Sequence, residues 1–126
     1  MKNLIEIKGD ASQRKFFRKK NRNTSSIIVI SKKEKFKNLI VYDAINKILK
    51  KNKILAPTLF DENYSKNYIE IEDFGNDTIF KILSKKRYDK FFYFKKIIQT
   101  LNEIQKKKKK SIKNFKNRIF LIPKYN

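Results

Sequence analysis

The chain has 126 residues, of which 33 are lysine or arginine and 12 are aspartate or glutamate, giving a formal net charge of +21. It contains no cysteine, which excludes disulfide bonds, thiolate zinc sites and cysteine nucleophiles, and it contains no histidine. The length suits one small domain or one lobe of a larger domain. No apolar run approaches the ~20 residues that span a bilayer, and the N-terminus lacks the apolar core of a signal peptide. We therefore expect a soluble, cytoplasmic protein with no membrane partner.

The positive charge has two interpretations. A strongly basic chain ordinarily points to nucleic acid or to an anionic membrane as its partner. However, lysine, asparagine and isoleucine dominate throughout, with only two glycines and two prolines, as expected where AT-rich codons bias a whole proteome. We give more weight to this bias, although a lysine-rich surface would still bind polyanions non-specifically.

The N-terminal third is predicted to form three strands in a meander. Residues 3–8 are β-prone, and the turn at Gly9 ends this first strand. A second strand carries Phe16 and Phe17 on opposite faces. The third, Ser26 to Ile30, is a compact β-branched run typical of a central strand buried on both faces.

A helix and two further strands are expected next. Apolar residues recur at three-and-four spacing from Phe36 to Leu49, which predicts an amphipathic helix ending near Asn52. The expected elements after this helix are a strand at 58–60, a hairpin loop at 61–67 and a fifth strand at 68–72.

Two helices are expected after a break at residues 73–77. Asp77 or Thr78 is expected to cap a short helix that runs through Leu83. From Tyr88 a long helix has an apolar face broader than one small sheet could cover, and it ends in the lysine run 106–110. Such a face is a liability for aggregation unless a partner covers it.

The segment from Gly9 to Arg18 joins a turn of small residues to a cationic strand. Gly9 tolerates a positive φ, and the side chains of Asp10 and Ser12 can bond nearby backbone amides and hold a tight loop. Positions 14, 16 and 18 share one face of a strand, so Arg14 and Arg18 point the same way. Two guanidinium groups on one face of a hairpin could clamp an oligophosphate.

This segment resembles the opening motif of bacterial sugar kinases related to the aminoglycoside phosphotransferases, which are distant relatives of protein kinases. The closest branch phosphorylates the anomeric hydroxyl of N-acetylmuramate and N-acetylglucosamine in cell-wall recycling. Residues 69–78, Ile-Glu-Ile-Glu-Asp-Phe-Gly-Asn-Asp-Thr, are similar to the strand and hinge of the same family. Pro57 and the run 122–125 also match family positions. The resemblance spans nearly the whole chain but only the first part of the family's domain.

The resemblance implies an α+β fold: a kinase-like small lobe with a five-stranded antiparallel sheet and one packing helix in residues 1–73, then a hinge and the first helices of an incomplete large lobe in 74–126. It implies ATP as the nucleotide, with magnesium in the complete enzyme. The hinge would contact the adenine edge mainly through main-chain atoms. The residues expected at the nucleotide are Gly9, Asp10, Ala11, Ser12, Arg14, Arg18, Ile30, Glu72, Asp73 and Phe74.

Two features depart from protein kinases. Asp73-Phe74-Gly75 has the letters of their magnesium-binding motif, but it follows the fifth strand with no catalytic loop before it, so we interpret it as hinge. The third strand also lacks the lysine that usually pairs with an acidic residue on the helix. Lys32 and Lys33 come only at its end, and the helix offers Asp43. The family branch also lacks this lysine, which would leave phosphate contact to Arg14 and Arg18.

Catalysis by this chain alone is not expected. In the family, a His-x-Asp loop and a later aspartate of the large lobe supply the base and the metal ligands, and the chain has no histidine. An incomplete sequence is the preferred explanation, with a split enzyme or a reused lobe as alternatives, and a sugar acceptor would bind only with a complete large lobe. Two other functions stay open. One is a nucleic-acid-binding module, in which the aromatics among lysines in 14–20 and 90–96 would stack on bases; the other is a non-catalytic pseudokinase lobe.

Overall fold

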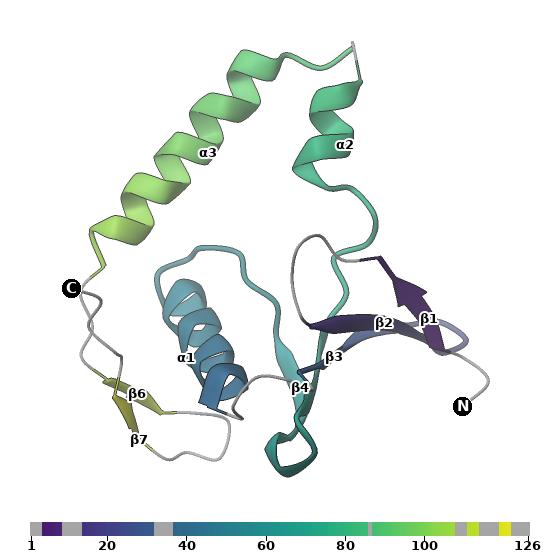
Figure 1. The fold of residues 1–126 in the computed structure, drawn as a ribbon. Coiled ribbons are helices and arrows are strands. Elements are labelled where there is room, and N and C mark those ends of the chain that lie inside the picture. Colours follow the sequence, from purple (N-terminus) through teal and green to yellow (C-terminus); the bar gives the residue numbers. More distant parts are fainter. Residues whose placement is uncertain are drawn as a thin grey trace. The chain divides into compact units, whose positions relative to one another are not determined.

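A five-stranded antiparallel sheet, followed along the chain by helices, gives the protein an α+β fold (Figure 1). The computed structural model describes residues 4–8, 14–31, 37–85, 87–107, 111–113 and 119–121. Two compact units divide it: residues Met1–Asp73 with Lys110–Asn126, and residues Phe74–Lys109. Each unit is described by itself.

The sheet of the first unit has the order β1-β2-β3-β5-β4 among the described residues. Its strands are β1 (Leu4–Ile7), β2 (Lys15–Lys20), β3 (Ser25–Ile30), β4 (Leu59–Asn63) and β5 (Tyr68–Glu72). The predicted meander of the first three strands is present, and the predicted fifth strand lies beside β3.

Register places the core on one face of this sheet. Ile27 pairs with Ile71 and Val29 pairs with Ile69, so these four side chains point to the same side and are buried. Ile28 and Ile30, on the opposite side of β3, are only partly buried. Ser26, on that same side, is buried. The expected burial of the third strand is therefore complete toward the core and partial on the opposite face.

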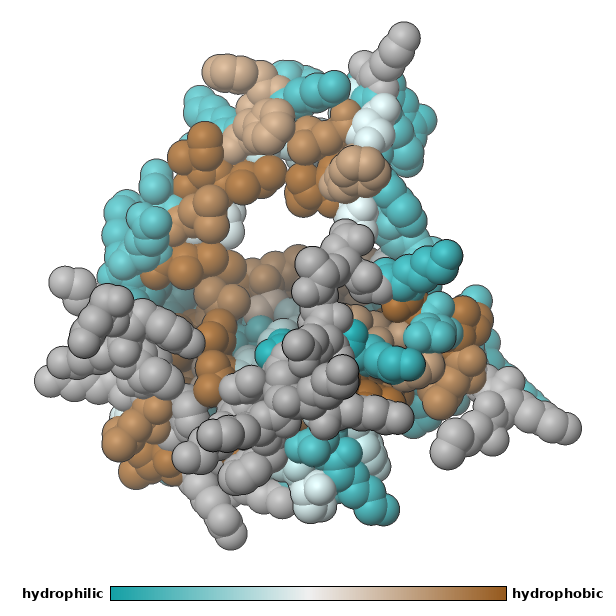
Figure 2. All heavy atoms as spheres, viewed as in Figure 1, coloured by the Kyte–Doolittle hydropathy of each residue, from teal (hydrophilic) through white to brown (hydrophobic). Residues whose placement is uncertain are grey.

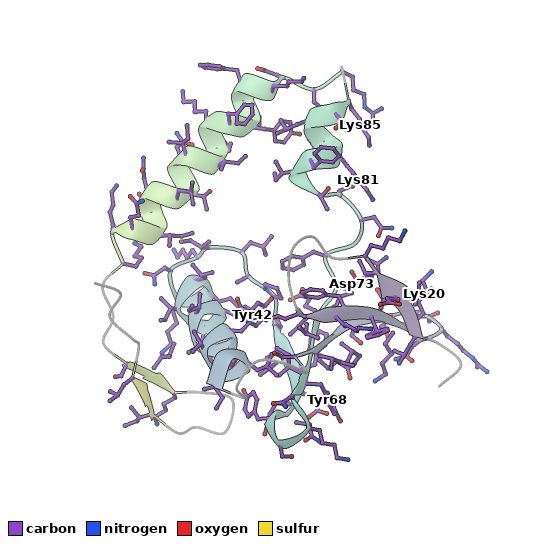
Figure 3. All side chains as sticks on the ribbon, viewed as in Figure 1. Lys20, Tyr42, Tyr68, Asp73, Lys81 and Lys85 are labelled. Atoms are coloured by element: carbon purple, nitrogen blue, oxygen red, sulfur yellow. The ribbon has the colours of Figure 1, made fainter. Side chains whose placement is uncertain are left out.

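Helix α1 (Lys37–Lys51) supplies the other side of this core. Leu39 is fully buried in one cluster with Ile27, Val29 and Ile69, and Tyr42 also packs against that cluster (Figure 3). Of the apolar residues whose spacing predicted the helix, Leu39 and Ile40 take part in this packing, whereas Ile45 is 43% exposed.

The C-terminus of α1 closes with a Schellman motif, in which two backbone bonds run back over the last turn. The Ile54 N–H donates to the Leu49 carbonyl and the Lys53 N–H donates to the Lys50 carbonyl, both at 3.0 Å. Lys53 has a φ of 60°, the left-handed conformation that this motif requires and that glycine usually supplies.

The segment predicted as a hairpin loop at 61–67 forms the end of a strand and a 3-10 turn. Strand β4 continues through Asn63, where the sequence suggested a loop, because its polar residues pair with β5 as Asp61 with Glu70 and Glu62 with Ile69. A 3-10 turn (Tyr64–Lys66) then leads into β5, with the Asn63 side chain accepting a bond from the Lys66 N–H.

A small hairpin from the end of the chain also belongs to the first unit. Strands β6 (Ser111–Lys113) and β7 (Ile119–Leu121) pair antiparallel, although the sequence suggested only an apolar terminal stretch. Ile112 is buried, and the Lys47 side chain of α1 donates to the Lys113 carbonyl at 3.3 Å. The terminal run 122–125 lies outside the described residues.

The second unit contains the two predicted helices, α2 (Ile79–Ser84) and α3 (Lys90–Gln105). Thr78 caps α2 by accepting a bond from the Lys81 N–H, which decides between the two expected caps, and Asp89 caps α3. Large apolar side chains gather along both helices (Figure 2). Several on α3 are at least half exposed: Phe91, Phe92, Phe94, Ile98 and Leu101. Within the described ranges, no helix is both long and apolar enough to cross a bilayer.

Candidate functional site

The best-formed polar contact in the sheet joins Arg18 of β2 to Asp73, the first residue after β5. The Arg18 Nε–H donates to Asp73 Oδ2 at 2.6 Å and its Nη2–H donates to Oδ1 at 3.0 Å. Bidentate pairing of this kind gives the strongest hydrogen bonding between a guanidinium and a carboxylate. The side chains are only 15% and 4% exposed, so solvent screens the pair weakly.

Strand register explains why residues 55 positions apart meet. Arg18 pairs with Ile27 of β3, and Ile27 pairs with Ile71 of β5, so these residues lie side by side across three strands. Asp73 follows Ile71 by two positions and therefore points to the same side as Arg18. Ser25 completes the cluster by donating its hydroxyl to Asp73 Oδ2 at 2.7 Å. Figure 3 shows Asp73 at the end of the sheet that also carries Lys20.

The structure brings only some of the predicted nucleotide residues together. Arg14 immediately precedes β2, so the strand periodicity that would place it on one face with Phe16 and Arg18 stays a prediction. Ile30 is three residues beyond Ile27 in the same strand and therefore lies on the opposite face from Arg18. The predicted loop residues Gly9, Asp10, Ala11 and Ser12 lie outside the described residues.

Glu72, expected at the hinge, is already engaged within the sheet. Its N–H donates to the Thr58 carbonyl at 2.8 Å, and its carboxylate accepts bonds from both the Thr58 hydroxyl and the Thr58 N–H. These hydrogen bonds, reinforced by the charge of Lys50, lower the pKa of Glu72 below its ordinary value. The main-chain N–H of Glu72 is therefore already taken up by Thr58. Phe74 begins the second unit, and its side chain is exposed.

A second polar cluster, which the sequence did not reveal, lies on the other face of the sheet. Lys19 Nζ donates to both carboxylate oxygens of Glu70, at 3.0 and 3.2 Å, and the Ser26 hydroxyl donates to the same carboxylate. Burial raises the pKa of Glu70, but the bonds from Ser26 and Lys19 outweigh it and the pKa is lowered. Strand order would have been needed to find this cluster, because the three residues come from three different strands.

The acidic residue expected on the helix pairs within the helix itself. Asp43 is 1% exposed, and its Oδ2 lies 3.4 Å from Nζ of Lys47, one turn along α1. Strand β3 (Ser25–Ile30) carries no lysine, and Lys32 and Lys33 lie outside the described residues. In the part of the chain that the structure describes, no group of three or more acidic side chains gathers as a metal site.

The chain was also compared with known proteins, and it matches no protein-family model and no curated protein sequence.

Proposed function

We propose that this chain is the nucleotide-binding part of an ATP-dependent phosphotransferase that acts on an amino sugar, as the resemblance of residues 9–18 and 69–78 implies. One observation supports this above the others. Arg18 closes the first motif, Asp73 stands in the second, and the two form a bidentate ion pair. Two segments that would have to share one site are thus in direct contact.

The ion pair suggests how a phosphate would be held. The guanidinium of Arg18 is planar, and Asp73 holds it through Nε and Nη2. Asp73 orients that plane, while Arg14, one residue before β2, adds a second cation. Both arginines would contact the phosphates of ATP, and the main chain of Asp73 would contact its base. Magnesium, when bound, would neutralise charge on the phosphates, and its protein ligands are not among the residues proposed here.

The proposed activity of this chain is binding and not phosphoryl transfer. The transfer step needs a carboxylate that orients or accepts the hydroxyl proton, which the family places in a His-x-Asp loop. The sequence has no histidine. Incubation of the purified 126-residue chain with ATP and amino sugars is therefore expected to yield no sugar phosphate, and measurable product would contradict this part of the proposal.

Titration with a fluorescent ATP analogue at raised salt tests the binding itself, because salt suppresses non-specific attraction to a basic surface. Arg14→Ala and Arg18→Lys are each expected to weaken ATP binding about tenfold. Arg18→Lys keeps the positive charge but loses the planar, bidentate hydrogen-bonding geometry of the guanidinium. Arg22→Ala, an exposed arginine in the turn before β3, removes the same charge and should leave affinity unchanged. Equal affinities in all four proteins, or equal binding of tripolyphosphate, would overturn the proposal.

Binding of single-stranded nucleic acid is the competing function, and one observation favours it. Aromatic rings on α3 are exposed beside lysines, and Lys96 Nζ lies 5.7 Å from the centre of the Phe92 ring. Such platforms stack bases with little sequence preference. Tight, strongly salt-dependent binding of an oligothymidine, lost in Phe91→Ala with no affinity for ATP, would establish this function in place of the first.

A further inference from the structure

The first unit contains a pocket. It has a volume of about 510 Å³ and is formed by one side of α1, the segment that leads into β4, and strand β6. Pockets of this size hold small organic ligands. None of Arg14, Arg18 and Asp73 lines it. Any ligand here would therefore bind independently of the proposed nucleotide site.

Asn46 gives this pocket an unused hydrogen-bond donor. The residue is 7% exposed and lines the pocket, and its Nδ2 has no hydrogen-bond partner in the described part of the chain. Leaving a buried amide N–H₂ unbonded costs free energy, because its bonds to water are lost on folding. A ligand with acceptor oxygens would supply the missing partner.

The charges around the pocket favour an anion. Asp43 is the acidic residue in its lining, and Lys47 lies against that carboxylate and neutralises it. Three further lysines, Lys50, Lys51 and Lys113, also line it. Lys50 donates to the Thr58 hydroxyl, which in turn donates to the carboxylate of Glu72. The pocket lining therefore keeps a net positive charge.

We propose that this pocket binds an organic phosphate monoester. A phosphate carries nearly two negative charges and three acceptor oxygens at neutral pH, enough for the Asn46 amide and for more than one lysine. Pro57, Leu59 and Ile112 form an apolar wall that suits a ring or alkyl body on the ester. The ligand class is thus a phosphorylated small molecule with an apolar part.

Nuclear magnetic resonance can test this with phenyl phosphate as the probe and the full 126-residue chain as the protein. The Asn46 side-chain N–H₂ resonances report directly on the pocket. Saturable shifts of these signals and of the Ile112 amide are expected. Inorganic phosphate, which lacks the apolar body, and benzoate, which carries one charge, should both bind at least several-fold more weakly. Tighter binding of either would overturn the assignment.

Matched variants separate the pocket from general attraction to lysine. Lys51→Ala should weaken phenyl phosphate binding about tenfold, as expected for loss of a bond to a charged group, and its exposed side chain can be removed without disturbing the core. Asn46→Ala should do the same if it folds. Lys95→Ala, an equal loss of charge on α3, should bind as wild type. Shifts that do not saturate, or equal affinity in Lys51→Ala and Lys95→Ala, would refute the proposal.

Discussion

Among the described residues, the carboxylate of Asp73 accepts two hydrogen bonds from Arg18 and one from Ser25. Taking such a pair out of water costs nearly as much as its attraction returns, so a buried ion pair is weak evidence for stability. Its effect is geometric. The pair fixes the end of β5 against β2 and holds the Arg18 guanidinium in one plane.

Removing one partner of this pair should nevertheless be costly. Asp73→Asn leaves the Arg18 charge largely buried without a counter-charge, and we expect the free energy of unfolding to fall by about 3 kcal/mol. Urea unfolding followed by circular dichroism measures the change. Asp77→Asn, an exposed aspartate close by in the chain, is the control and should change stability by no more than about 0.5 kcal/mol. Equal losses in the two variants would show that the ion pair does not hold the sheet end.

Both partners of this pair were named from the sequence, but their contact was not. Arg18 and Asp73 stand in motifs whose local chemistry is visible in the letters. Their meeting depends on β5 lying next to β3, with Ile27 level with Ile71. Register of this kind is set by pairing between distant segments, which periodicity within one segment does not encode.

Among the elements, those with strong periodicity were predicted and those with weak periodicity were not. The apolar spacing of α1 and the β-branched run of β3 each extend over enough residues to predict a helix and a strand. Strands β6 and β7 have three residues each, too few for a pattern. In β4, the polar letters of 61–63 favour a turn, and pairing with β5 overrides that local preference.

The end of α1 carries a correctable strain. Lys53 adopts a φ of 60° at the position where the Schellman motif normally has glycine, and a side chain there crowds the following carbonyl. Lys53→Gly is expected to raise the free energy of unfolding by up to about 1 kcal/mol, and thermal or urea unfolding would show it.

Asn67 provides a matched control, since it has a φ of 55° in the turn before β5. Asparagine tolerates this conformation far better than lysine, so Asn67→Gly should gain less than Lys53→Gly. A loss of stability in Lys53→Gly would mean that the lysine side chain contributes more than its backbone strain costs.

At the scale of the whole molecule, charge and apolar surface are distributed differently over the two units. The first unit buries its apolar residues between sheet and helix, whereas α3 in the second leaves Phe91 80% exposed. The sequence predicted this broad apolar face from spacing alone. A net charge of +21 opposes self-association through such a face, and salt weakens that opposition.

Two hydrogen-bonded carboxylates make the stability of the protein sensitive to acid. The carboxylates of Glu70 and Glu72 have pKa values lowered below the ordinary 4.5 in the folded protein, so the unfolded chain binds protons more readily. Their contribution to stability is complete above pH 4.5 and is lost as the pH falls from there through the lowered values. Each protonation also adds to the positive charge. The free energy of unfolding, measured by urea titration at successive pH values, should therefore decline steeply below pH 4.5.

Glu70 offers the sharpest test of this decline, because its partners can be removed one at a time. Ser26→Ala takes away one bond that lowers its pKa, and Glu70→Gln takes away the titrating group. Both variants should be less stable than wild type at pH 7, and both should lose less stability between pH 7 and pH 3, Glu70→Gln least of all. If the free energy of unfolding of both variants falls with pH in parallel with that of wild type, then protonation of other groups and general charge repulsion destabilise the protein in acid. Added salt would then restore most of the lost stability, since it screens repulsion between exposed charges more strongly than it changes a hydrogen-bonded carboxylate.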